Sequence, residues 1–146
     1  MVKSYSFTFK TIEEKVITPI GGIISSDTTL SLDKSPYTLT QDIQIDYGVT
    51  LNIEPGVVIK GNNYNIKTLG KLNAVGSEEA KIIFEGVNIG INGTASKNAL
   101  IDIRYSEING GSLMAAGGNA EYGSFSLKDS YIKDVKKYMY GTQQQT

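Results

Sequence analysis

The stretch that decides the fold is GVTLNIEPGVVIK, residues 48–60. Apolar side chains at 49, 51 and 53 alternate with polar ones at 50 and 52, and this period of two predicts a strand with one buried face. Pro55-Gly56 then favours a tight turn, and the alternation resumes at Val57 and Ile59. The stretch therefore predicts two short strands joined by a corner.

The same pair of strands recurs along the chain. The inward-facing residues predicted for the first strand of each repeat are Tyr37/Leu39, Leu51/Ile53, Ile66/Thr68, Ile82/Phe84, Ile101/Ile103 and Phe125/Leu127. Those predicted for the second strand are Ile43/Ile45, Val57/Ile59, Leu72/Ala74, Ile89/Ile91, Ile108 and Ile132. Successive repeats lie 14, 15, 16, 19 and 24 residues apart in the first strand and 14, 15, 17, 19 and 24 in the second. Because both spacings lengthen together, they predict a parallel coil of about six rungs, each stacked about 4.8 Å from the next.

The clearest internal match is IDIRYSEI, residues 101–108, against FSLKDSYI, residues 125–132. The two segments align without gaps and place Ser106 over Ser130. An antiparallel sandwich is the alternative for short strands at such spacing, but no strong hairpin dipeptide separates the strand pairs of the first three repeats. We therefore expect an N-terminal β cap and lead-in over residues 1–34, a parallel β-helix over 35–137 and a polar tail over 138–146.

The order of motifs carries a family resemblance. SPYTLTQDIQIDYGVTLNIEPGVVIK (35–60), followed by LGKLNAVGSEEAKIIFEG (69–86), resembles the opening rungs of bacterial right-handed parallel β-helix repeat proteins with a pectate-lyase-like fold, and residues 101–109 resemble later rungs. The resemblance covers about residues 22–135. It implies an all-β, right-handed solenoid and a secreted, cell-surface or virion protein. It does not specify the function, because the same coil carries lyases, phage tailspikes, adhesins and surface-layer segments.

Composition excludes several classes of function. The 146 residues suit one domain, and they include no cysteine and no histidine. Disulfides, thiol chemistry and the commonest general base and metal ligand are therefore absent. The 14 basic and 15 acidic residues do not point to nucleic acid. The sequence contains no run of 18 apolar residues, so no membrane-spanning helix is predicted. The N-terminal MVKSYSFTFK lacks an apolar core of signal-peptide length.

Without histidine or cysteine, hydrolysis or elimination would depend on carboxylates, Arg, Lys or Tyr. The best cluster is Glu85, Arg104 and Lys128, which we expect to point outward, one rung apart. Asp102 and Ser126 are expected on the same outer face. Lyases of the resembling family use an arginine base beside carboxylates that hold calcium, so Arg104, Glu85, Asp102 and Asp129 are weak catalytic candidates by resemblance. A ladder of salt bridges on a solvated sheet face is the simpler interpretation, and no catalytic residue, metal site or cofactor is predicted.

The glycine-rich segment GGSLMAAGGNAEYG, residues 110–123, predicts a protruding loop with an apolar tip. Long loops on a rigid scaffold are frequent binding sites. The ligand-binding residues predicted there are Leu113, Met114, Asn119 and Tyr122.

Three functional hypotheses follow. The first is a non-catalytic β-helix module of a surface, secreted or virion protein, which acts as a rigid structural or adhesive domain and binds a polysaccharide or another protein. The second is a lyase-like domain active on acidic polysaccharides, with Arg104 central on the outer face. The third is end-to-end self-association through the ends of the solenoid, where strand edges are unpaired.

Overall fold

The computed structural model describes residues 16–91, 99–115, 123–139 and 144–145. These residues form sixteen strands and one short 3-10 turn, η1 (Leu32–Lys34). All strand pairings among them are parallel. The predicted parallel solenoid is thereby confirmed, and the antiparallel sandwich is excluded.

The strands line three walls of the coil. Face 1 consists of β2 (Thr28–Leu30), β4 (Thr50–Ile53), β7 (Lys71–Val75), β10 (Leu100–Arg104), β13 (Ser124–Lys128) and β16 (Gln144–Gln145). Face 2 consists of the first part of β3 (Tyr37–Ile45), β5 (Val58–Lys60), β8 (Ile82–Glu85), β11 (Ser106–Asn109) and β14 (Tyr131–Lys133). Face 3 consists of the second part of β3, β6 (Asn65–Thr68), β9 (Asn88–Ile91), β12 (Ser112–Ala115) and β15 (Lys136–Met139).

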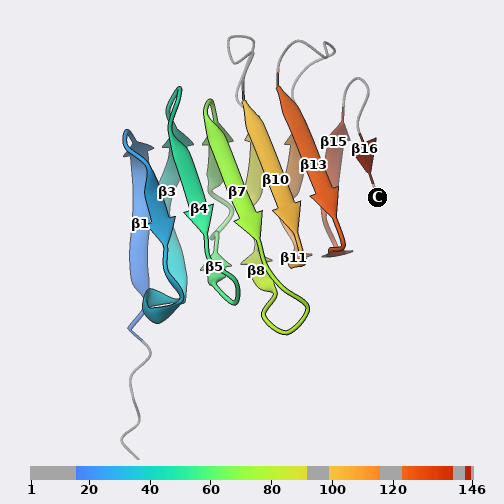
Figure 1. Cartoon of the computed structure of the whole chain (residues 1–146), viewed down its shortest axis with the longest axis horizontal. Coiled ribbons are helices and arrows are strands. Elements are labelled where there is room, and N and C mark those ends of the chain that lie inside the picture. The colour runs from blue at the N-terminus through green and yellow to red at the C-terminus, as the bar shows by residue number, and fades with distance from the viewer. Residues whose placement is uncertain (1–15, 92–98, 116–122, 140–143, 146) are drawn as a thin grey trace, which may run out of the picture.

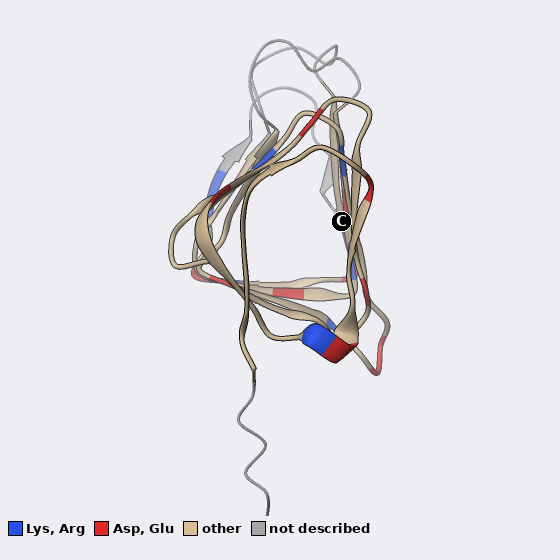
Figure 2. Ribbon diagram, turned by 90° about the vertical axis from the view of Figure 1, so that its left-hand side faces the viewer, with Lys and Arg blue, Asp and Glu red and all other residues tan. Residues whose placement is uncertain are grey.

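The coil is right-handed. The strands of face 1 run downward on the near side in Figure 1, the chain returns upward on the far side, and it advances from left to right. This is the hand that parallel strands joined by crossovers almost always adopt. Figure 2 looks along the coil and shows its walls around a common interior. Before the first full turn, β1 (Thr18–Ile24) pairs with both parts of β3, the part in face 2 and the part in face 3. The pairing has an irregularity between Ile20 and Gly22.

The number of rungs predicted from the sequence is wrong. The coil has about four turns, and each turn contributes three strands rather than two: β4–β6, β7–β9, β10–β12 and β13–β15. Leu51 therefore pairs with Leu72 and not with Ile66, while Ile66 pairs with Ile43 and Ile89. The last repeat is correct, because Ile101 pairs with Phe125 and Ile108 with Ile132.

Corner length explains the error. On face 3, equivalent residues of successive turns are 23, 23, 24 and 24 positions apart. On face 1, Leu51, Leu72, Ile101 and Phe125 are separated by 21, 29 and 24 positions. Most of the difference between 21 and 29 arises between face 3 and face 1: two residues lie between the end of β6 and the start of β7, whereas eight lie between the end of β9 and the start of β10. The spacing in sequence therefore does not reveal the spacing in the coil.

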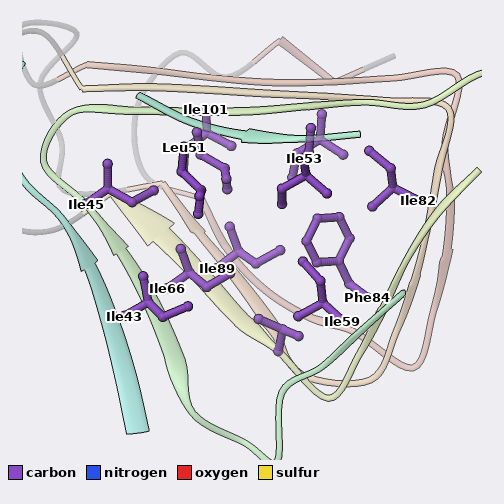
Figure 3. Close-up of a cluster of buried hydrophobic side chains, with 14 of the residues drawn as sticks. Ile43, Ile45, Leu51, Ile53, Ile59, Ile66, Ile82, Phe84, Ile89 and Ile101 are labelled. Carbon is purple, nitrogen blue, oxygen red and sulfur yellow. The ribbon is translucent and has the colours of Figure 1, made fainter. Parts of the chain in front are cut away.

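The core is the part of the fold that the sequence predicted best. Every residue assigned to the inside is buried, except Ile132, which is half-buried and packs against the core. Equivalent side chains stack from turn to turn, as Ile43, Ile66 and Ile89 do along face 3 (Figure 3). Two polar residues, Thr68 and Ser106, are buried with this core. Ser106 Oγ donates to the Arg104 carbonyl, whereas the Thr68 hydroxyl has no hydrogen-bond partner among the described residues.

The predicted boundaries of the cap, the β-helix and the tail stay predictions, since residues 1–15 and most of the tail lie outside the described residues. The part of the chain that the structure describes has no helix long and apolar enough to cross a membrane.

Candidate functional site

The predicted cluster on face 1 is partly assembled. Arg104 and Asp102 lie on the outer surface of β10, and the Arg104 Nε–Asp102 Oδ1 distance is 3.0 Å. Arg104 pairs with Lys128 of the next turn, and Asp102 pairs with Ser126. Two cations thus stand side by side with one carboxylate, on a surface where the Arg104 side chain is 45% exposed.

Glu85 does not belong to this cluster. It lies on β8 in face 2, where it pairs with Lys60 and Asn109, whereas the residue that pairs with Arg104 on the preceding turn is Val75. The predicted stacking of Glu85 on Arg104 is wrong because the sequence analysis assigned two strands to each turn. Asp129 is exposed at the corner after β13, in a left-handed conformation with φ 49°. No group of three or more acidic side chains that could hold a metal occurs among the described residues.

The predicted binding loop is also rearranged. Residues 112–115 form β12 and so belong to face 3. Leu113 is fully buried, where it stacks on Ile89, and this corrects its assignment to an apolar loop tip. Met114 points outward and is 44% exposed. Asn119 and Tyr122 lie outside the described residues.

A row of polar side chains that the sequence analysis missed crosses face 3. We call it the polar row, and its members are Asp42, Asn65, Asn88, Ser112 and Lys136. Asn65 pairs with Asn88, Asn88 with Ser112 and Ser112 with Lys136 in neighbouring strands. Each asparagine precedes an inward isoleucine by one position, so its side chain points outward. The signal that could have found its first four members is a small polar residue directly before a buried apolar one, repeated every 23 or 24 positions.

Hydrogen bonds orient the members of the row. The backbone N–H and the Nδ2 of Asn65 donate to Asp42 Oδ1 over 2.9 and 3.1 Å. One turn further on, Ser112 Oγ donates to Asn88 Oδ1 over 2.9 Å, and Asn88 Nδ2 donates to the Asn63 carbonyl over 2.7 Å. These contacts fix the rotamers of Asn65, Asn88 and Ser112 while leaving other lone pairs and N–H groups directed at solvent.

The first charged residue of the row is stabilised in its ionised form. Hydrogen bonding from the backbone N–H of Asn65 lowers the pKa of Asp42, and the Asn65 amide and Lys67 act in the same direction. Lys67 Nζ lies 3.4 Å from Asp42 Oδ2. The positive charge of Lys67 is therefore balanced by the Asp42 carboxylate.

Two shallow depressions border the polar row. The first is lined by Asn65, Lys67, Asn88, Gly90, Ser112 and Met114, together with Ile66, Ile89 and Ile91. The second is lined by Asn63, Asn65, Asn88, Gly111, Ser112, Asp134 and Lys136. Because Asn65, Asn88 and Ser112 line both, we treat them as one surface and call it the face 3 groove. It combines amide, hydroxyl and charged groups with a methionine side chain and two glycines.

Comparisons with known proteins give little information on function. No protein family model and no solved structure matches this chain. A stretch of 66 residues is 39% identical to the protein named Protein bark beetle from Drosophila melanogaster. The match covers 44% of this chain and 2% of the Drosophila protein, so it places the chain in no family.

Proposed function

We propose that this chain is a non-catalytic β-solenoid module of a surface, secreted or virion protein, which acts as a rigid adhesive domain and binds glycans through the face 3 groove. The observation that carries the proposal is the polar row, in which outward side chains of successive turns are held in place at one surface. Sugar hydroxyl groups both donate and accept hydrogen bonds, and the row offers both kinds of partner.

Rigidity supports the proposal. The middle turns are hydrogen-bonded to a neighbour on each side along three faces, and their interiors stack isoleucine on isoleucine. A solenoid of this kind gains stability from each interface between turns. Side chains mounted on such strands stay in position without a ligand, so binding requires little ordering of the protein.

The test is a glycan array that presents neutral and acidic polysaccharide fragments to the full chain. We expect binding to glycans that is lost in the double variant Asn88→Ala/Ser112→Ala and retained in Asn52→Ala, whose residue lies on face 1. An array without any bound glycan would contradict the proposal.

A second candidate is action on acidic polysaccharides at face 1. The observation that favours it is the pairing of Arg104 with Lys128 beside the carboxylate of Asp102. These three side chains together carry a net positive charge. A lyase assay on polygalacturonate with added calcium tests it. Cleavage that is lost in Arg104→Ala would establish this function in place of a non-catalytic one; intact substrate after incubation with the full chain would remove it.

A further inference from the structure

We infer that the face 3 groove selects an uncharged, extended glycan, with one sugar ring packed on Gly90 and Met114. The inference rests on the proposal that this groove binds glycans, and it adds the class of glycan, its direction and the position of one subsite. Three properties of the groove carry it: its charge, its shape and the spacing of its polar groups.

The charges around the groove balance. Lys67 lies 3.4 Å from Asp42 at one end, and Lys136 and Asp134 both line the other end. Two cations are thus matched by two carboxylates. A chain of uronates or sulfated sugars would find no excess of positive charge to attract it. Face 1 differs, since Arg104 and Lys128 stand beside the single carboxylate of Asp102.

Gly90 supplies the shape. In the outer row next to the polar row, Gly90 pairs with Lys67 on one side and with Met114 on the other. A Cβ at this position would lie 3.0 Å from the Met114 carbonyl oxygen and 3.2 Å from its Cβ, so even an alanine would intrude on Met114. The glycine leaves a flat step of backbone beside the half-exposed Met114 side chain. Methionine adapts readily to the surface that it contacts, and this step suits the C–H face of a pyranose ring.

The polar groups fix the direction of the chain. Asn65, Asn88 and Ser112 belong to three consecutive turns, and neighbouring strands of a sheet lie about 4.8 Å apart. This spacing is close to the advance of one hexose in an extended glycan. A glycan that runs along the solenoid axis would therefore place successive sugars beside successive members of the polar row. Each sugar of such a glycan would make equivalent contacts with one turn of the solenoid.

The experiment is a titration of the isotope-labelled full chain, followed by the shifts of its backbone amide signals in NMR spectra. The probes are cellohexaose and β-1,4-mannohexaose, which are neutral, and hexagalacturonate, which is acidic. We expect one of the neutral probes to bind with a Kd of roughly 10 μM to 1 mM and to shift the signals of Asn65, Gly90 and Ser112. Hexagalacturonate should leave these signals in place.

Variants locate the subsite. Gly90→Leu fills the step, and Met114→Ala removes the apolar surface without adding volume, so the second variant serves if the first does not fold. Each should weaken binding of the neutral probe about tenfold, as expected for the loss of one well-packed contact. Asn73→Ala on face 1 is the matched control and should not change the affinity. Circular dichroism and thermal melting verify that each variant is folded.

The outcomes separate the inference from the proposed function. Tighter binding of hexagalacturonate in the groove would overturn the inference and leave the proposed function standing. Unchanged affinity in folded Gly90→Leu or Met114→Ala, or shifts confined to residues 102–104, would overturn the inference as well. If no probe binds and the glycan array is also blank, both are wrong.

Discussion

Face 1 and face 3 are built alike and differ in one outer row. Both carry a central line of small polar residues joined from turn to turn, by Asn73 Nδ2 and Asn52 Oδ1 at 3.0 Å on face 1 and by Ser112 Oγ and Asn88 Oδ1 at 2.9 Å on face 3. The next outer row contains Val75, Arg104 and Lys128 on face 1. On face 3 the corresponding row contains Lys67, Gly90 and Met114.

This difference shows what makes a binding surface on a solenoid. On face 1 every described position of the row beside the polar ladder carries a side chain, those of Val75, Arg104 and Lys128. Replacing one flanking side chain by hydrogen, as at Gly90, opens a step beside the ladder. The face 3 groove therefore depends on a residue without a side chain as much as on the polar residues that line it.

The largest expected effect tests what the two faces have in common, their buried side. Ile53 lies under face 1 and Ile89 under face 3, and both are almost completely buried. Replacing either by aspartate puts an unpaired charge in the core and should cost about 4 kcal/mol or more of stability, enough to unfold the chain. Urea denaturation followed by circular dichroism measures this. The outward controls Asn52→Asp and Asn88→Asp should stay folded, and a wild-type-like transition for Ile53→Asp or Ile89→Asp would contradict the register.

A smaller effect distinguishes the two interiors. Thr68 is fully buried under face 3, between Ile45 and Ile91, and its hydroxyl has no partner within the described part of the chain. Thr68→Val keeps the shape and removes the unpaired hydroxyl, so it should stabilise the protein by about 1–2 kcal/mol in denaturation experiments. Thr50→Val, on the outer side of face 1, is the control and should change the stability by less than about 0.5 kcal/mol. A destabilised Thr68→Val protein would mean that the hydroxyl is hydrogen-bonded.

The polar ladders themselves should differ in strength. Asn88 makes two side-chain hydrogen bonds, to Asn63 and Ser112, and Asn73 makes one, to Asn52. We expect Asn88→Ala to cost about 1 kcal/mol and Asn73→Ala about half of that, since these bonds are only partly shielded from water. Equal losses in thermal melting would show that the extra bond of Asn88 contributes nothing to folding.

The smallest effect concerns the charged end of the polar row. The pKa of Asp42 is lowered in the folded protein, so its ionised form favours folding. This contribution is complete above the ordinary aspartate pKa of about 3.9 and disappears as the pH falls through the lowered value. Asp42→Asn should therefore reduce the loss of stability on acidification from about pH 5 to about pH 2, measured by urea denaturation at each pH. Asp33→Asn, in η1, is the control. If Asp42→Asn lost as much stability on acidification as the wild-type chain, the lowered pKa of Asp42 would be contradicted.

Local sequence pattern predicted the strands and their buried residues well. The alternation around residues 48–60 holds for the whole coil, and even the polar Thr68 was correctly assigned to the inside. Prediction of the site was less successful. Arg104, Asp102 and Lys128 were correctly placed together because they lie in the last gapless repeat, while Glu85 was misplaced by one wall of the coil. The face 3 groove was missed, because Ile66 and Ile89 had been assigned to different strands of a two-strand repeat and residues 110–123 to a protruding loop. Asn65, Asn88 and Ser112 were therefore not recognised as neighbours.

The sequence by itself thus determined which side of each strand faces the core. This property depends only on the alternation of side chains along an extended backbone and on the exclusion of apolar groups from water. Only the tertiary structure decided that three strands make one turn, and hence which outward residues of successive turns become neighbours. The number of strands in a turn depends on how corners of different lengths close three walls around one core. It is set by contacts between residues more than twenty positions apart, which a local sequence pattern does not show.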